Sequence, residues 1–104
     1  MTITEVNISL RDEGKLKGFA NIVLDDLFLI RGLKIIRGMH KYFIAMPNRK
    51  QKNGVYIDIA HPIKNDFRIQ MEKVILDKYW EEVKQTQGEE STIIQLETDD
   101  NNWE

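Results

Sequence analysis

Apolar and polar residues alternate along the first half of the chain with the period of half-buried β-strands. One alternating segment covers residues 4–10 and a second covers residues 16–24. The charged turn 11–14 joins them, so a β-hairpin is predicted. A third apolar segment, 27–36, is rich in β-branched and large apolar residues and predicts a long strand that can bend at Gly32.

Two more strands are predicted on either side of a polar loop. Residues 42–46 form the first and end at Pro47, which has no amide hydrogen to donate to a strand ladder. Residues 48–54 are polar and basic and end in Asn-Gly, which is a strong turn signal. Apolar residues then alternate over 55–59, so this segment is predicted to be the fifth strand.

After Pro62 the apolar period becomes that of a helix. Asn65 or Asp66 can cap the first turn by accepting its amide hydrogens, and the helix is predicted to continue to about Lys84. Its apolar stripe follows the spacing i, i+4, i+7 and i+8. The stripe consists of Phe67, Met71, Val74 and Ile75, followed by Lys78 or Tyr79.

Oppositely charged residues lie four positions apart on the outer face of this helix. The pairs are Arg68 with Glu72 and Lys73 with Asp77. Each such pair contributes only about 0.2 to 0.5 kcal/mol to helix stability. The pairs therefore support the helix without defining it.

Together these elements predict an α+β domain over residues 1–84, with a mostly antiparallel sheet of about five strands followed by a C-terminal helix. Residues 85–104 are rich in Gln, Gly, Ser, Thr, Asp and Asn and are expected to form an acidic, flexible tail. The apolar patch 92–96 can form a short strand or dock on the body. A domain of this size buries only about two-thirds of the surface of its unfolded chain. Because the chain also has no cysteine, we expect a homodimer to supplement its core.

The charges of the chain are divided unevenly. Residues 1–84 contain all fifteen Lys and Arg against eleven Asp and Glu, a net charge of +4, whereas residues 85–104 are all acidic or neutral and carry −6. Within the body, residues 27–57 contain seven basic residues and no acidic one. A stretch of one sign attracts polyanions such as nucleic acids. The seven are Arg31, Lys34, Arg37, Lys41, Arg49, Lys50 and Lys52.

The basic loop is the first candidate for a binding site. Arg49, Lys50 and Lys52 precede its glycine, where mobile cations can reach phosphates, and phosphate contacts supply most non-specific affinity for nucleic acids. Lys64 and Arg68, on adjacent turns at the start of the helix, can extend the patch if the helix lies beside the loop. The alternative for all five is an ordinary solvated surface.

A family resemblance rests on two short sequence strings at a fixed separation. The first is Ala-Met-Pro at 45–47, followed by the basic pair 49–50 and Gly54, and the second is Asp-Ile-Ala-His-Pro-Ile at 58–63, followed by a capped helix. In this block the chain resembles SpoVG, the stage V sporulation protein G family. The similarity in pattern covers about residues 3–80.

The resemblance implies more than the residues alone. It implies a mostly antiparallel sheet followed by a helix, dimerisation through the sheet, and binding to DNA or RNA. It also implies effects on gene expression, on septation and cell division and, in spore-forming hosts, on sporulation. The basic stretch lies where contact with nucleic acid would require it.

Other candidate sites carry less weight. His61 and Asp58 are three residues apart and point to opposite faces of a strand, so a structural hydrogen bond from His61 is favoured over a metal site. Of the aromatic residues, Tyr56 is the best candidate for stacking on bases, because it lies opposite the apolar side of its predicted strand. Most of the others are expected in the core or in a dimer interface.

Enzymes and secreted or membrane proteins carry recognisable sequence motifs, which this chain lacks. The chain lacks a phosphate-binding glycine motif, a serine nucleophile elbow and HExxH, so we expect no enzyme, no cofactor and no small-molecule substrate. The first ten residues do not resemble a signal peptide and no apolar run is long enough to cross a bilayer, which favours a cytoplasmic protein without membrane attachment. The alternative function is a protein–protein interaction module that acts in septation through exposed β-edges, without binding nucleic acid.

Overall fold

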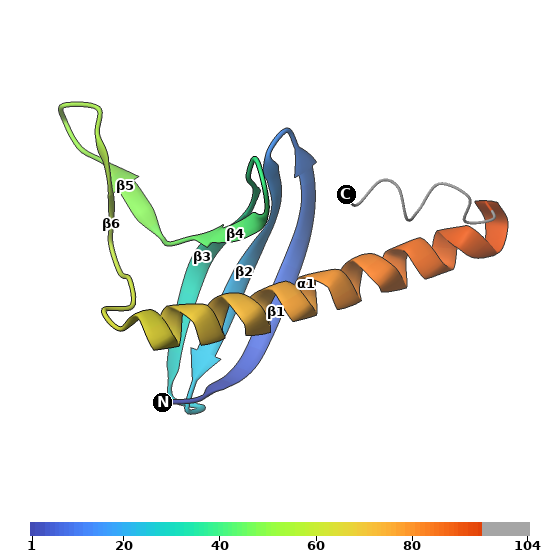
Figure 1. Cartoon of the computed structure of the whole chain (residues 1–104), viewed down its shortest axis with the longest axis horizontal. Helices are drawn as coiled ribbons and strands as arrows, with labels where there is room; N and C mark the ends of the chain where they lie inside the picture. The colour runs from blue at the N-terminus through green and yellow to red at the C-terminus, as the bar shows by residue number, and fades with distance from the viewer. Residues whose placement is uncertain (95–104) are drawn as a thin grey trace.

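Six strands precede one long helix in this computed structural model, which describes residues 1–94 and the side chains of residues 1–86. The first four strands form an antiparallel sheet in the order β1-β2-β3-β4, and the last two form a separate ribbon. Helix α1 lies across one face of the sheet, and the β5–β6 ribbon projects away from it (Figure 1). The elements are β1 (Ile3–Glu13), β2 (Leu16–Leu24), β3 (Phe28–Arg37), β4 (Tyr42–Ala45), β5 (Asn48–Lys50), β6 (Tyr56–Asp58) and α1 (Asn65–Ile94).

The predicted alternation places one side of each sheet strand in the core. Every second residue of β2 from Gly18 to Leu24 is buried, and Leu33 and Ile35 of β3 lie beside them. The helix contributes a stripe spaced by four, which resolves the choice between Lys78 and Tyr79 in favour of Tyr79. Full burial of one such aliphatic side chain stabilises the fold by about 1.5 to 3 kcal/mol. The buried core consists of Ala20, Ile22, Leu24, Leu33, Ile35, Ile44, Met46, Met71, Ile75, Tyr79 and Val83.

The turn between β2 and β3 is held by the start of the chain. Asp25 and Asp26 both have positive φ, at 53° and 58°, which Asp tolerates better than most residues. The amide of Asp25 donates to the carbonyl of Thr2 at 2.7 Å, and the amide of Thr2 donates to the Asp25 carboxylate at 2.7 Å. The Thr4 hydroxyl accepts from the amide of Asp26 at 3.0 Å. These bonds hold the β2–β3 turn against the N-terminus of the chain.

The bend that Gly32 makes possible is present. Its φ is +81°, and the β2–β3 register shifts between Ala20 and Ile22, opposite this point. The amide of Gly32 donates to Oδ1 of Asn21 at 3.2 Å. A bulge of this kind increases the local twist of the sheet.

The structure confirms the α+β fold and corrects two details of the sheet. Residues 48–50, predicted as loop, form β5 and pair with β6, because the turn at Asn53-Gly54 folds the chain back on itself. The fifth predicted strand therefore does not join the main sheet. Its apolar residues are exposed rather than half-buried.

The helix differs from its prediction in length and in one ion pair. It continues ten residues past Lys84 to Ile94, since Gln and Glu favour helix and a single interior Gly costs only about 1 kcal/mol. Residues 92–94 of the apolar patch are thus helical, and the rest of the predicted flexible tail, 95–104, lies outside the described residues. Lys73 pairs with Asp77 at 2.8 Å as predicted. Glu72 instead accepts from the amide of Ile44 at 3.5 Å and makes no ion pair with Arg68.

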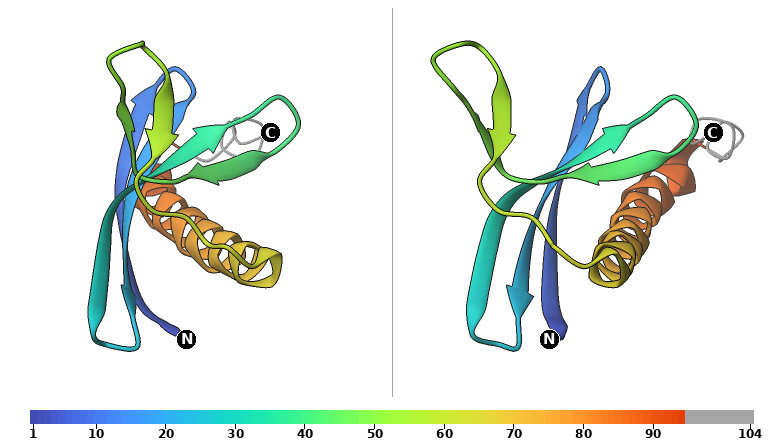
Figure 2. Two further views of the ribbon diagram at one scale, coloured as in Figure 1. Left: turned by 90° about the vertical axis from the view of Figure 1, so that its left-hand side faces the viewer. Right: turned by 60° about the vertical axis from the view of Figure 1, so that its left-hand side comes forward.

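Helix α1 packs on one face of the main sheet. Its contacts are with β1 and β4, the two outer strands, so that it crosses the whole sheet (Figures 1 and 2). Over residues 1–94, no helix combines the length and the apolar character that crossing a membrane requires.

Candidate nucleic-acid interface

The β5–β6 ribbon is built by a short set of backbone hydrogen bonds. At its base the amide of Ile59 donates to the carbonyl of Pro47 at 2.7 Å. At its tip the amide of Gln51 donates to the carbonyl of Val55 at 2.8 Å, and Oδ1 of Asn53 accepts from the amide of Val55 at 3.0 Å. Gly54 has φ +89°, a conformation that a residue with a Cβ adopts only with strain. The tip is therefore an ordered turn.

Three predicted site residues lie on this ribbon. Arg49 and Lys50 belong to β5 and Lys52 to the tip, and all three are exposed. Within residues 1–86, none of the three forms an ion pair. Their charges are thus available to an external anion, as the prediction requires.

The ladder register adds an aromatic residue to these cations. Lys50 is directly opposite Tyr56 and Arg49 directly opposite Ile57. Residues opposite each other in an antiparallel pair share a face, with Cβ atoms about 4.5 to 5.5 Å apart. One face of the ribbon therefore carries a cation beside Tyr56, whose side chain is 64 % exposed. This exposure agrees with the assignment of Tyr56 as the stacking candidate.

The cations at the helix start are separate from the ribbon tip. Lys64 immediately precedes α1 and is exposed, and Arg68 in its first turn is half-buried. The ribbon points away from this end of the helix in both Figures 1 and 2. Within one chain, Lys64 and Arg68 therefore lie apart from the ribbon tip, and their part in binding stays a prediction.

Cations farther along the helix are in a different electrostatic state. Lys78 contacts Glu81 at 3.1 Å and Glu82 at 3.5 Å. The hydrogen bond to Glu81 and the charges of both glutamates raise the pKa of Lys78. A lysine whose charge is already paired with glutamates has fewer counterions to release than the unpaired cations of the ribbon.

Tyr42, Phe67, Tyr79 and Trp80 belong to the core or pack against it, as expected, whereas Phe28 and Phe43 are exposed. Tyr79 is buried, and the half-buried rings of Tyr42 and Trp80 pack beside it with centroids 5.9 and 4.8 Å from its own. Burial, followed by the influence of Tyr42 and Asp12, raises the pKa of Tyr79 to about 12. Tyr79 is thus a structural residue that stays neutral at physiological pH.

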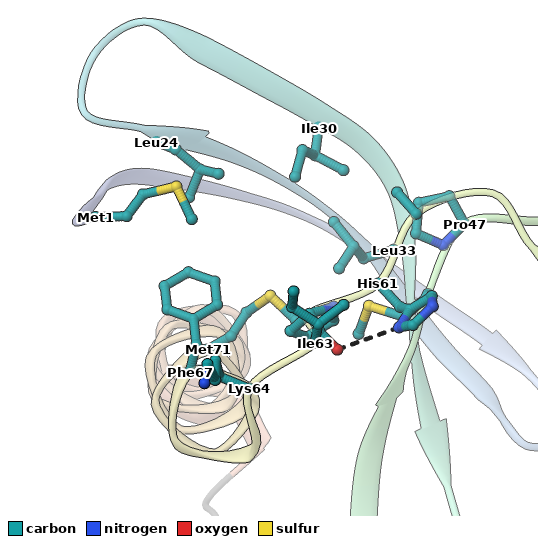
Figure 3. Close-up of a pocket in the computed structure, with 13 residues that line it drawn as sticks. Met1, Leu24, Ile30, Leu33, Pro47, His61, Ile63, Lys64, Phe67 and Met71 are labelled. Carbon is teal, nitrogen blue, oxygen red and sulfur yellow. Dashed lines mark hydrogen bonds between the residues drawn. The ribbon is translucent and has the colours of Figure 1, made fainter.

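The segment between β6 and α1 covers an apolar pocket of about 270 Å³ (Figure 3). Pro47, Ile63, Phe67 and Met71 are among the residues that line it. His61 lies at its edge and shares a hydrogen bond of 3.1 Å between Nδ1 and the carbonyl oxygen of Pro62, which is the structural role expected of it. The pocket can receive an apolar group.

Sequence reasoning missed one feature of this surface. The turns β1–β2 and β3–β4 bring Lys15 beside Arg37 and Lys41, close to Trp80. Lys15 lies outside the basic stretch 27–57, and 65 residues separate it from Trp80, so no local pattern could have joined them.

Comparison with known proteins gives one consistent result. The sequence profile of the SpoVG family matches residues 1–81. A Myxococcus xanthus protein described as "Putative septation protein SpoVG" is 49 % identical over 88 residues, which cover 85 % of this chain and 89 % of that protein. A protein of the same description from Anaeromyxobacter sp. strain K is 48 % identical, over 81 % of this chain and 83 % of that protein. Another, from Bdellovibrio bacteriovorus, is 40 % identical, over 92 % of this chain and 86 % of that protein.

Proposed function

The chain belongs to the SpoVG family, and from this premise we propose that it is a non-enzymatic, cytoplasmic regulator that binds DNA or RNA. Its relatives are described as "Putative septation protein SpoVG", and this description supports an effect of this chain on septation and cell division. An effect on sporulation in spore-forming hosts is part of the same proposal. The β5–β6 ribbon is the contact surface in this proposal.

One observation carries the proposal. A protruding ribbon presents Arg49, Lys50 and Lys52 without acidic partners, and the register sets Tyr56 beside Lys50 on one face. Cations on such a ribbon can follow a phosphate backbone, and an exposed aromatic ring can stack on an unpaired base. A stacked base contributes about 1 to 3 kcal/mol by alanine substitution, so the arrangement favours single strands over duplex.

Dimerisation is part of the same proposal. The ribbon and the segment after it expose apolar side chains, among them Val55 at 54 %, Ile59 at 65 % and Ile63 at 86 %. The outer edges of β1 and β4 lack a strand partner within the described residues. A homodimer would cover such surfaces and bring two ribbons into one assembly. Lys64 and Arg68 would then contribute as a second group of cations.

The exposed apolar residues also favour the second candidate function. A partner protein of the septation machinery could dock on Val55, Ile57 and Ile59, with the neighbouring cations serving only solubility. The two candidates predict different responses to salt, because contacts to phosphate release counterions and apolar contacts do not.

The test replaces the three ribbon cations together. Arg49→Ala, Lys50→Ala and Lys52→Ala in one full-length variant should lower the slope of log affinity against log salt by about two to three units, since each phosphate contact contributes about 0.7 on single strands and 0.9 on duplex. Fluorescence anisotropy with a labelled single strand and its duplex measures the slope.

A matched control removes three charges from α1. Lys73, Lys78 and Lys84 changed to Ala alter the net charge equally, but two of them are neutralised by Asp77 and by Glu81 and Glu82. This control should change the slope by less than the ribbon variant. If a folded ribbon variant keeps the parent affinity and slope, the ribbon is a solvated surface and the interaction module becomes the better proposal.

A further inference from the structure

A second basic surface lies in a pocket of about 620 Å³ between two turns of the main sheet and α1. The turn between β1 and β2 forms one wall and the turn between β3 and β4 another. The amide of Arg37 donates to the carbonyl of Lys15 at 2.9 Å, and the amide of Gly38 donates to the carbonyl of Lys41 at 2.9 Å. These bonds tie both walls to the sheet.

Close packing keeps the second wall in its shape. A Cβ at Gly38 would lie 2.7 Å from the Lys41 carbonyl oxygen and 3.2 Å from the ring of Phe43. Any side chain at this position would push the turn outward. The Lys41 backbone can lie this close to residue 38 only because residue 38 is a glycine.

The lining of the pocket is basic. Lys15, Arg37, His40 and Lys41 contribute to it from the two turns, and all four are exposed. No acidic residue lies among the described residues that line it. Lys15, Arg37 and Lys41 also form no ion pair within residues 1–86. The pocket therefore has the charge to hold a phosphate or another anion.

The inner wall of the pocket is aromatic. Tyr42 and Trp80 line it, with ring centroids 5.0 Å apart and planes inclined by 60°. Trp80 packs edge-on against the buried ring of Tyr79 at 4.8 Å, which holds the indole in place. Both lining rings are half-buried, so part of their surface faces the pocket.

Size and chemistry together narrow the class of ligand. Pockets for small molecules measure about 300 to 1,000 Å³, and the volume of this pocket lies within that range. Inorganic phosphate would use the cations alone, and an apolar ligand would use the rings alone. A group that carries both a phosphate and a flat ring uses the whole lining.

We propose that this pocket binds a nucleotide, with its base against Tyr42 and Trp80 and its phosphate among Lys15, Arg37 and Lys41. The nucleotide can be free or can be one unit of a single strand. As a site for a free nucleotide, the pocket goes beyond the proposed function; as a strand contact, it rests on that function. It shares no residue with the ribbon, so the two sites can fail independently.

The first test uses Trp80 as its own reporter. Trp103 is the only other tryptophan and lies outside the described residues, so Trp103→Phe in the full chain leaves one indole signal. Adenosine monophosphate should quench this fluorescence and bind at least about tenfold tighter than adenosine or inorganic phosphate, each of which makes half of the contacts. Equal affinity for the monophosphate and for inorganic phosphate would overturn the proposal.

A matched pair of arginines on one strand provides the control. Arg37→Gln should weaken binding of adenosine monophosphate about tenfold, because a charged hydrogen bond is lost. Arg31→Gln makes the same change on β3 at an exposed position six residues away, about 20 Å along the strand, and should have no effect. Equal effects of the two variants would mean non-specific charge attraction and would contradict the proposal.

The last arm separates the two sources of nucleotide. A trinucleotide of deoxyadenylate that binds at least about tenfold tighter than the monophosphate identifies a strand contact, and equal affinities identify a free nucleotide; both results support the pocket. The variant with Arg49, Lys50 and Lys52 changed to Ala should bind the monophosphate like its parent even if it loses nucleic-acid binding. If that variant loses the monophosphate as well, the binding site is not this pocket.

Discussion

Tyr79 links the packing of the core to a pH dependence that can be measured. Its side chain is 2 % exposed between α1 and the sheet, and burial raises its pKa to about 12 from the ordinary value of 10.0. In the unfolded chain the phenol ionises near pH 10, whereas in the folded protein it stays neutral to about pH 12. Above pH 10 the unfolded state therefore binds fewer protons, so stability falls as pH rises.

The size of the effect follows from the difference between the two pKa values. Two units correspond to about 2.7 kcal/mol of unfolding free energy when both limits are reached. Below pH 10 the contribution of the neutral Tyr79 phenol to the unfolding free energy is complete. By pH 11 about 1.4 kcal/mol of this contribution should be lost. Lysine side chains titrate in the same range, so the effect has to be isolated by substitution.

The substitution is Tyr79→Phe, which removes the ionisable hydroxyl and keeps the ring. Urea denaturation followed by circular dichroism at pH 9 and pH 11 measures the loss for parent and variant, and the variant should lose about 1.4 kcal/mol less. Tyr56→Phe is the control, because Tyr56 is 64 % exposed on the ribbon. The reasoning is refuted if Tyr79→Phe shows the same loss between the two pH values as its parent.

Three further predictions concern the core, the acidic end and the assembly. Ile75→Ala, at a fully buried position, should lower the unfolding free energy by about 2 to 5 kcal/mol. Ile69→Ala, at a 58 % exposed position of the same helix, should lower it by about 0.5 kcal/mol or less. Chemical denaturation of both variants would show whether α1 packs as described. Truncation after Ile94 removes four acidic residues and keeps the helix, and it should tighten binding to nucleic acid at low salt, because the tail would otherwise compete with phosphate; unchanged affinity would leave the tail a solubilising segment. Light scattering of the full chain should give twice 12.3 kDa, and a monomer at micromolar concentration would exclude the dimer.

Local sequence patterns were sufficient for the main sheet and for the core face of the helix. Apolar residues of β2 such as Ile22 and Leu24 recur at every second position, and Met71 and Ile75 follow the helical period, so burial could be predicted from spacing. The predicted end of the helix at about Lys84 is wrong, because the change of composition after this residue does not end a helix. Glu and Gln continue a helix as readily as they form a tail.

The ribbon and the second basic pocket depend on pairing across the chain. Residues 48–50 have no apolar alternation, and they form a strand only because the turn at Asn53-Gly54 places them against β6. The partnership of Lys50 with Tyr56 likewise comes from the ladder register. Single-sequence patterns carry no information on such partners when one strand is wholly polar.

The most direct measurement for the central claim is the salt dependence of nucleic-acid binding by the unmodified full-length chain. The three ribbon cations alone predict that log affinity falls as log salt rises. For a labelled 20-nucleotide single strand, the slope should be about −2 or steeper. The exposed ring of Tyr56 predicts tighter binding to this strand than to its duplex at equal salt. Absence of binding at about 50 mM salt, or an affinity that does not change with salt, would contradict the account.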